Sequence, residues 1–514
     1  MTPGRISLRH LFSKMNAKII AWYVGIALLL VSALMIVSGI IAFHTPGDAS
    51  RTPLLFSAFL TGIVGAYPFI FIRNGSHKLN FREANCIVVV SWVFCCFFGM
   101  LPYLFYGEDF SFVNALFESV SGFTTTGASI LTDIEALPRG LQFWRISTAW
   151  VGGIGIVTLF SRLMFGHPDQ STLSGSTISY MARQGMSRAR SEYFANRILV
   201  IYIILTLVTS GAMKLTGLGW FDAVTTAMSA CSTCGFCNGN ASIASFGNPA
   251  AEVVLTVAML VSGINFSLIF LTFVKGSRNN VFKSEVIRVF LALVGICTLL
   301  VTTDLLSHGG YRSVGTALRD AAFQVASIAT TTGFATQDTT LWPPLSMGIL
   351  IICSVICGCS GSTSGGIKMD RVILAVKGIG KKIRNFASPS AVYTIRLDKS
   401  ARSEQQVGDA YAFIFCYLGI LAIGALVNAA CGLDFTTGFT ASIACIGNVG
   451  PGFGDVGSMA NYGQFPVLLK ISGMLEMLIG RLEIFPILYL LPIYSSHARL
   501  RRRRGIAAHT AVRC

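Results

Sequence analysis

Four glycines at the ends of short semi-apolar stretches are the residues whose spacing suggests a shared chemical task. The stretches 112–129, 220–237, 318–335 and 435–452 align without gaps. Each has a large apolar residue fifteen positions before its glycine and small residues twelve and six positions before it. A pattern kept at four places indicates an internal repeat. The aligned glycines are Gly127, Gly235, Gly333 and Gly450.

Glycine-rich turns of this kind can bind an ion if they lie inside a membrane. Glycine reaches left-handed dihedrals and leaves no side chain on an axis. Four turns around one axis would present rings of carbonyl oxygens, which replace the hydration shell of a monovalent cation such as potassium. The alternative is that they are packing turns between membrane helices. The predicted filter consists of Thr125, Thr126, Gly127, Thr233, Cys234, Gly235, Thr331, Thr332, Gly333, Asn448, Val449 and Gly450.

The composition places these turns in a membrane. Hydrophobic residues make up 53% of the 514 residues and charged residues only 12%, against about 25% charged in soluble domains. Apolar runs of the length that crosses a bilayer recur along the chain. The ten predicted spans are 19–47, 53–72, 85–107, 146–161, 198–213, 253–274, 289–303, 345–367, 411–433 and 471–496.

The basic residues report the orientation of these spans. The formal net charge is +16, and 31 of the 39 Lys and Arg lie in the segments that face inside if the N-terminus is cytoplasmic. This asymmetry predicts ten crossings with both termini in the cytoplasm. The charge therefore indicates topology and lipid contact rather than binding to nucleic acid. Outer acidic residues such as Asp133 and Glu135 would attract cations to the path.

The expected fold is an all-α polytopic membrane protein built from four repeats of helix, re-entrant pore loop and helix. Two additional N-terminal helices precede the repeats. The predicted divisions are 1–84 for the additional helices, 85–165, 194–275, 286–385 and 405–498 for the four pore repeats, and 499–514 for a basic cytoplasmic tail. The third repeat is expected to have an interrupted second helix.

A cluster of cysteines leaves a second class of function open. Cys231, Cys234 and Cys237 have a C-x-x-C-x-x-C spacing, which would suit a membrane redox protein. Most other cysteines lie inside apolar runs, where cysteine acts as a small hydrophobic residue. All seven histidines lie outside the core of every predicted span. We therefore favour the ion pathway over redox chemistry.

Five sequence motifs have a recognisable pattern: TTTG at 124–127, STCG at 232–235, TTTG at 330–333, NVGPG at 448–452 and GCSGSTSGGIKM at 358–369. On these motifs the chain resembles the bacterial Trk-type potassium uptake proteins, the TrkH/TrkG branch of the Trk/Ktr/HKT superfamily. The resemblance implies a transporter of potassium in the bacterial inner membrane, without enzyme activity or a prosthetic group. It also implies a homodimer and a cytosolic nucleotide-binding regulatory subunit of the TrkA type.

The resemblance further implies a gate below the filter. The corresponding family segment is an intramembrane loop that obstructs permeation, and a basic residue lines the pore beneath it. In this sequence the gate residues would be Gly358, Gly361, Ser362, Gly365, Gly366, Lys368 and Arg481. Arg481 is expected in the middle of the last span, with pairing to a neighbouring helix as the alternative role. A sodium or unselective cation pathway, and channel-like or proton-coupled transport, remain open.

Overall fold

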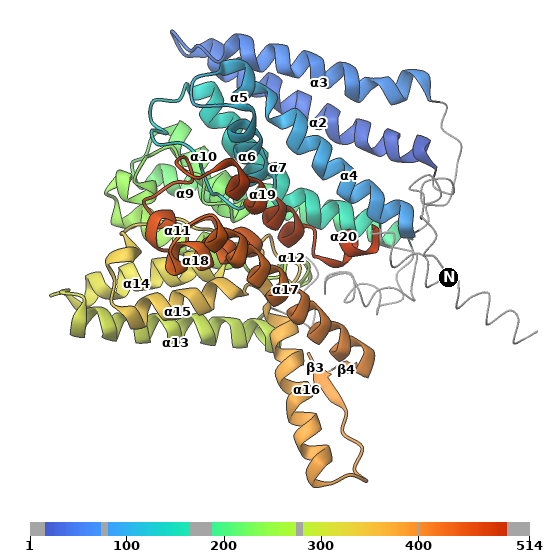
Figure 1. Cartoon of the computed structure of the whole chain (residues 1–514), viewed down its shortest axis with the longest axis vertical. Coiled ribbons are helices and arrows are strands. Elements are labelled where there is room, and N and C mark those ends of the chain that lie inside the picture. The colour runs from blue at the N-terminus through green and yellow to red at the C-terminus, as the bar shows by residue number, and fades with distance from the viewer. Residues whose placement is uncertain (1–15, 73–80, 164–187, 274–280, 399, 491–514) are drawn as a thin grey trace, which may run out of the picture.

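The structure is a computed structural model that describes residues 16–72, 81–163, 188–273, 281–398 and 400–490. It consists almost entirely of helices (Figure 1). The predicted basic tail 499–514 lies outside the described residues. The helices are α2 (Ala17–His44), α3 (Arg51–Phe71), α4 (Phe81–Gly99), α5 (Leu101–Tyr106), α6 (Phe112–Phe123), α7 (Arg139–Leu163), α9 (Arg188–Leu215), α10 (Trp220–Ser232), α11 (Pro249–Ser262), α12 (Phe266–Phe273), α13 (Glu285–His308), α14 (Val314–Ala329), α15 (Pro344–Val355), α16 (Met369–Ala387), α17 (Glu404–Ala430), α18 (Phe435–Gly447), α19 (Val467–Arg481) and α20 (Phe485–Leu490).

Several helices have the length and composition of membrane spans. Six described helices, α2, α3, the stretch Glu83–Tyr106, α9, α13 and α17, are long and apolar enough to cross a bilayer. The bent pair α11 and α12 raises this number to seven if it counts as one span. The chain is therefore an all-helical membrane protein with several apolar spans.

The surface of these helices is apolar while their packed faces carry small and hydroxyl residues. On α3, Phe59 and Ile70 are 63% and 71% exposed, whereas Ser57 and Thr61 are fully buried. Ser57 donates to a carbonyl of its own helix, so its hydroxyl is satisfied without water. This inside-out pattern is typical of helices that pack against one another in lipid.

Three of the ten predicted spans are broken rather than continuous helices. The run 253–274 is predicted as one span, and in the structure it consists of two helices, α11 and α12, that meet at an angle of 95°. The break falls at Gly263 and Asn265, where Gly263 follows α11 and the Asn265 side chain accepts from the backbone of α12. In the run 345–367, where an interrupted helix is predicted, helix α15 ends at Val355.

The last predicted span, 471–496, is also interrupted. Helix α19 ends at Arg481, and α20 begins only at Phe485. The backbone between them turns through positive φ at Glu483 and Ile484. Pro486 explains the break, because its ring would clash with the carbonyl four residues earlier. Arg481 is thus the C-terminal residue of α19 and not a mid-helix residue, a position where a cation interacts favourably with the helix dipole.

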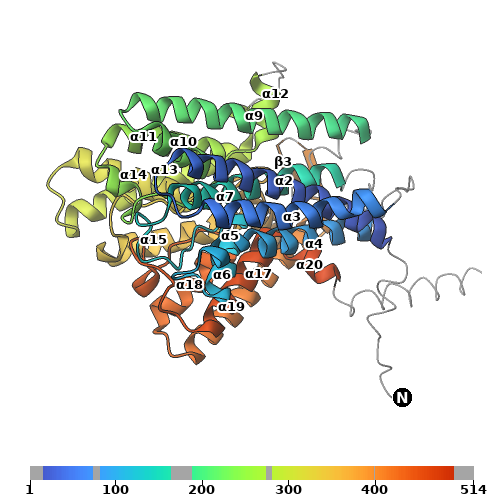
Figure 2. The same ribbon diagram turned by 90° about the horizontal axis from the view of Figure 1, so that it is seen from above.

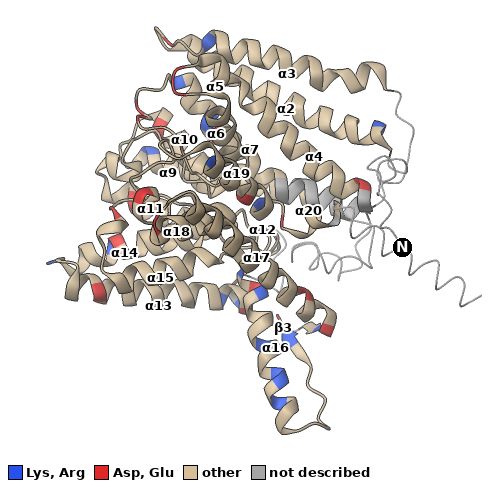
Figure 3. Cartoon of the chain, in the orientation of Figure 1, with Lys and Arg blue, Asp and Glu red and all other residues tan. Residues whose placement is uncertain are grey.

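Two short sheets complete the fold. Strands β1 (Ile356–Cys357) and β2 (Ile367–Lys368) pair in parallel and close the base of the loop 358–366. Strands β3 (Ile395–Leu397) and β4 (Ser400–Arg402) form an antiparallel pair beside α16. Helix α16 and this pair project from the helical body (Figure 1), and α16 contains several of the Lys and Arg residues (Figure 3).

The short helices α6, α10, α14 and α18 lie inside the bundle of longer helices. Figure 2 shows α9 and α10 on one side of this bundle and α17, α18 and α19 on the other. Each short helix packs against longer neighbours, for example α10 against α9 and α18 against α17. The four turns that follow them therefore meet in the interior of the protein.

Candidate functional site

The four predicted glycine turns have one backbone conformation. The glycines have φ values of 81°, 84°, 79° and 96° in chain order. The residue two positions before each glycine also has a positive φ, which is uncommon outside glycine. These residues are Thr125 at 52°, Thr233 at 55°, Thr331 at 58° and Asn448 at 53°.

The same hydrogen bond holds each turn against the end of its short helix. In each turn, the backbone amide of the residue before the glycine donates to the carbonyl of the residue five positions before that donor. The four bonds are Thr126 N to Ser121 O at 2.9 Å, Cys234 N to Ser229 O at 3.2 Å, Thr332 N to Ser327 O at 2.8 Å and Val449 N to Ala444 O at 2.9 Å. The acceptor carbonyl in each turn belongs to the small residue six positions before the glycine.

The four turns form a closed ring. A Cβ atom placed on any of the glycines would come within 3.0 Å of a carbonyl oxygen of the next turn, a distance that real Cβ atoms essentially never show. The carbonyls met in this way are Cys234 O for Gly127, Thr332 O for Gly235, Val449 O for Gly333 and Thr126 O for Gly450. The ring therefore runs from the first turn to the fourth and back to the first.

Side-chain hydrogen bonds lie within the first and third turns and join the fourth turn to the first. The hydroxyls of Thr124 and Thr126 lie 2.8 Å apart, as do those of Thr330 and Thr332. In the fourth turn, Asn448 Nδ2 donates to Thr126 Oγ1 at 3.0 Å and to Met477 O at 2.9 Å. The fourth turn lacks a hydroxyl of its own, and the side-chain amide of Asn448 bonds instead to the Thr126 hydroxyl in the first turn.

The glycines of all four turns line one cavity, together with Arg145, Asn240 and Tyr462. Near this cavity, Asn240 Nδ2 donates to Asp133 Oδ1 at 2.9 Å. The backbone amide of Asn240 donates to Glu135 Oε1 at 3.0 Å. The bond from Asn240 is the largest cause that lowers the pKa of Asp133. The carboxylate of Asp133 is thus favoured in its negative form beside the cavity.

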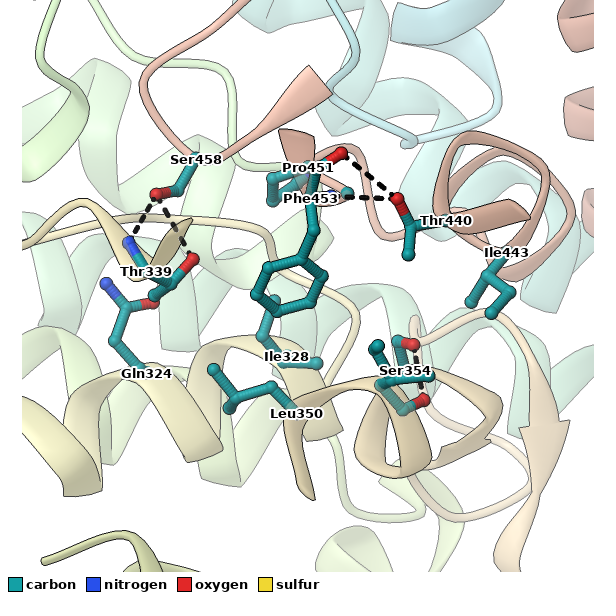
Figure 4. A pocket seen from close by; sticks show the side chains of 12 residues that line it. Gln324, Ile328, Thr339, Leu350, Ser354, Thr440, Ile443, Pro451, Phe453 and Ser458 are labelled. Atoms are coloured by element: carbon teal, nitrogen blue, oxygen red, sulfur yellow. Dashed lines mark hydrogen bonds between the residues drawn. The ribbon is translucent and has the colours of Figure 1, made fainter. Parts of the chain in front are cut away.

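The segment after the fourth turn is anchored on both sides. Tyr462 donates from its hydroxyl to Gly450 O at 3.1 Å and from its amide to Ser129 O at 2.8 Å. Figure 4 shows a pocket on the other side, where the Phe453 ring points toward Leu350. There Thr440 Oγ1 accepts from Phe453 N at 2.9 Å. These bonds hold the segment against the first repeated stretch, through Ser129, and against α18, through Thr440.

The predicted gate loop lies directly against the ring. Gly365 N donates to Thr331 Oγ1 at 2.8 Å, and Thr363 Oγ1 donates to Cys231 O at 3.1 Å. A Cβ on Gly365 would collide with Gly447 O. The loop 358–366 therefore contacts the ends of the second, third and fourth short helices or their turns.

The break between α11 and α12 holds this loop from the other side. Gly263 O accepts from Cys359 N at 2.9 Å, Gly361 O accepts from Phe266 N at 3.1 Å, and Asn265 Nδ2 donates to Ser360 O at 2.7 Å. Inside the loop, Ser362 Oγ donates to Cys359 O at 2.6 Å. The unexpected bend thus supplies backbone groups for the loop.

The remaining predicted gate residues lie at the base of the loop. Gly358 O accepts from Met369 N at 3.2 Å, and Gly366 has φ 62° beside the Cys357 side chain. Lys368 is buried, and its ammonium contacts the carbonyl of Ser364. The base of the loop is therefore fixed by backbone bonds and one buried cation.

Arg481 connects this loop to α7. It is 4% exposed, and its guanidinium donates to Thr363 O at 2.7 Å, Gly152 O at 2.9 Å and Gly153 O at 3.3 Å. All three acceptors are backbone carbonyls, one in the loop 358–366 and two in helix α7. The structure thus places Arg481 in contact with both the loop 358–366 and helix α7.

The cysteine cluster has the surroundings of packed side chains. Cys231, Cys234 and Cys237 are buried, and Cys231 Sγ lies 3.8 Å from Thr209 Oγ1. Among the described residues, no group of three or more His, Cys, Asp and Glu side chains is arranged to hold a metal ion. What the cluster contributes to the ring is the backbone carbonyl of Cys234.

Two features of the site were not predicted from the sequence. The bend at Gly263 and Asn265 gives only a weak signal, a Gly and an Asn two residues apart within an apolar run. The buried ion pair of Glu118 and Arg145 joins residues 27 positions apart. Its signal was the presence of one acid and one base in otherwise apolar helical segments, where charges are expensive.

The fold and site define a helical membrane protein with a carbonyl-lined ring of four turns in its interior. The family described as "TrkH: Cation transport protein" matches residues 55–498. The chain is 32% identical over 486 residues to the Trk system potassium uptake protein TrkH of Salmonella typhimurium, covering 93% of this chain and 98% of the relative. It is 28% identical over 442 residues to TrkG of Escherichia coli K12, covering 85% and 90%.

A solved structure agrees with these relatives. The crystal structure of the potassium transporter TrkH from Vibrio parahaemolyticus superposes with a TM-score of 0.83 at 30% identity, covering 93% of this chain and all of that one. The chain belongs to the TrkH family of cation transport proteins. It is therefore a member of a transporter family and not an enzyme.

Proposed function

We propose that this protein takes up potassium ions across the bacterial inner membrane through the ring of four glycine turns. The observation that carries the proposal is the closed contact of each filter glycine with the carbonyl of the next turn. Rings of backbone carbonyls bind a dehydrated monovalent cation in place of its water. Potassium is the ion named for the relatives in both TrkH and TrkG. The ion is cargo, and the transport requires no prosthetic group.

The same proposal assigns the topology. Four repeats, 85–165, 194–275, 286–385 and 405–498, each contribute a helix, a re-entrant pore loop and a second helix, and two helices within 1–84 are added. The equal backbone conformation of the four turns supports this division. With the broken helices counted as crossings, the chain has ten spans and both termini in the cytoplasm. The basic arm formed by α16 then lies on the cytoplasmic side, where anionic lipid headgroups bind Lys and Arg.

The loop 358–366 is assigned as the gate. Its contacts with Thr331 and with the end of α10 place backbone directly against the ring. Lys368 and Arg481 add positive charge beside this loop, which opposes the passage of a cation. In this assignment the path is obstructed as long as Arg481 holds Thr363.

The proposed regulation needs partners beyond the single chain. We assign a homodimer with one path in each subunit, and a cytosolic nucleotide-binding subunit of the TrkA type that moves the gate. The basic inner segments, including α16, are the docking surfaces available to that subunit.

Ion flux in liposomes tests the function. The purified protein is reconstituted, and uptake of potassium, rubidium and sodium is measured under imposed voltage and pH gradients. Potassium and rubidium flux well above sodium flux supports the proposal, whereas equal fluxes would support an unselective cation pathway. A response to the pH gradient at zero voltage would identify proton coupling, and dependence on voltage alone would identify channel-like transport.

A further inference from the structure

A buried ion pair lies behind the outer end of the ring. Glu118 on α6 and Arg145 on α7 are 2.5 Å apart between Oε1 and Nε, and their side chains are 0% and 2% exposed. Breaking a buried pair by removing one partner leaves an uncompensated charge, which is strongly unfavourable. The carbonyl ring described above does not require these charges, so their presence needs a separate explanation.

The pair is bonded to the exit segments of two turns. Glu118 accepts from Ser129 Oγ and Ile130 N, both at 3.1 Å, just beyond the first turn. Arg145 Nη1 donates to Cys237 O at 3.1 Å, two residues beyond Gly235. The guanidinium also lies 3.6 Å from the centre of the Phe236 ring. One ion pair thus fixes the first exit segment relative to the second.

The pair also controls the charge beside the ion path. Arg145 lines the cavity with the four filter glycines, so its charge alone would repel an entering cation. Glu118 cancels that charge at hydrogen-bond distance. The residues at the equivalent position, nine before the glycine in the other turns, are uncharged: Thr226, Gln324 and Ala441. At this position, a charged residue therefore occurs in the first repeat only.

We propose that Glu118 and Arg145 are positioning residues that set the spacing between the first two turns and keep this cavity free of net positive charge. This inference rests on the proposed potassium pathway and assigns two further residues to its selectivity. It separates two effects: the bonds to the exit segments determine selectivity, and the cancellation of charge determines the apparent affinity for the entering ion.

Three variants test both effects in the reconstituted full chain. Glu118→Gln leaves Arg145 uncompensated, and we expect the potassium KM to rise and the potassium-to-sodium flux ratio to fall about tenfold, or about 1.4 kcal/mol. In the double variant Glu118→Gln with Arg145→Gln, the KM returns toward the parent while the flux ratio stays low. Arg145→Lys keeps the charge but loses the planar fork that reaches both Glu118 and Cys237, so the ratio falls with little change in KM.

Glu252→Gln is the matched control. Glu252 forms an ion pair with Arg319 at 2.8 Å between α11 and α14, and neither residue lines the cavity of the filter glycines, so its loss should leave the ratio and KM unchanged. Folding is monitored by size exclusion in detergent, and Arg145→Lys decides the question if Glu118→Gln does not fold. A folded Glu118→Gln variant with unchanged flux ratio and KM would overturn the proposal that Glu118 and Arg145 are positioning residues. Absence of potassium-selective flux in the parent chain would instead refute the proposed function.

Discussion

The guanidinium of Arg481 donates to the carbonyl oxygen of Thr363 at 2.7 Å. This bond joins the end of α19 to the centre of the loop that lies against the ring. The hydroxyl of the same Thr363 donates to Cys231 O at the end of α10. Arg481 also bonds to α7, so side chains and backbone from all four proposed repeats meet at this point.

Replacing Arg481 should open the path. Arg481→Ala removes a positive charge and the bonds to Thr363 and α7, so we expect basal potassium flux to rise severalfold in the absence of any regulatory subunit. Arg481→Lys is the matched control, because it retains the charge and should raise flux less. The measurement is potassium flux into liposomes. Flux equal to or below the parent in a folded Arg481→Ala protein would assign Arg481 a structural role only.

The first filter glycine should determine selectivity. In Gly127→Ser the new Cβ would collide with Cys234 O, at a φ of 81° that side chains rarely adopt. The ring must widen there, and we expect the potassium-to-sodium flux ratio to fall about tenfold or more. Gly295→Ser is the control, since a Cβ at Gly295 on α13 meets nothing within 4 Å. An unchanged ratio for Gly127→Ser would refute the filter assignment.

The repeated spacing of small and apolar residues was sufficient to predict where the turns fall, because the same geometry had to be encoded four times. The left-handed residues before the glycines were harder to predict. Thr125, Thr233 and Thr331 are β-branched and carry no local signal for a positive φ. That conformation is accompanied by the hydrogen bond to the end of the short helix and by ring contacts between residues about a hundred or more positions apart.

The breaks in the predicted spans were also difficult to predict from the sequence. Hydropathy predicted 253–274 correctly as apolar, but it does not distinguish a straight helix from one bent at Gly263. The bend is stabilised by loop 358–366, which lies far away in sequence. For Arg481, the composition indicated a costly charge at membrane depth, whereas its position at a helix end depends on Pro486 and on carbonyls of α7.

The contact between loop and ring predicts a gating variant. Thr331→Val removes the hydroxyl that accepts from Gly365 N at 2.8 Å while keeping a β-branched side chain and the filter carbonyls. We expect a severalfold rise in basal flux with an unchanged potassium-to-sodium ratio. Thr331→Ser keeps the acceptor and should behave like the parent. A change in the ratio without a change in basal flux would contradict the role of this bond in gating.

The N-terminal helix pair predicts a stability effect separate from transport. A Cβ on Gly25 of α2 would lie 2.7 Å from Gly65 O on α3. Gly25→Ala should therefore destabilise the pair by about 1–3 kcal/mol, the usual cost of overpacking. Gly211→Ala on α9, where a Cβ meets nothing within 4 Å, is the control. Thermal unfolding in detergent measures both, and equal melting temperatures would show that α2 and α3 separate at little cost.

Asn265 offers a variant that separates loop anchoring from helix capping. Its Nδ2 donates to Ser360 O at 2.7 Å, while its Oδ1 accepts from Ser267 N at 2.9 Å at the start of α12. Asn265→Asp keeps the capping oxygen but places a carboxylate against a carbonyl, so the loop should loosen.

We expect Asn265→Asp to raise basal potassium flux severalfold with little change in melting temperature. Asn265→Ala loses the cap as well, and should raise flux and also lower stability by about 1 kcal/mol. Liposome flux and thermal unfolding are measured on the same preparations. If Asn265→Asp transports like the parent, the bend between α11 and α12 does not restrain the gate, and the obstruction depends on the contacts of loop 358–366 with Arg481 and the ring.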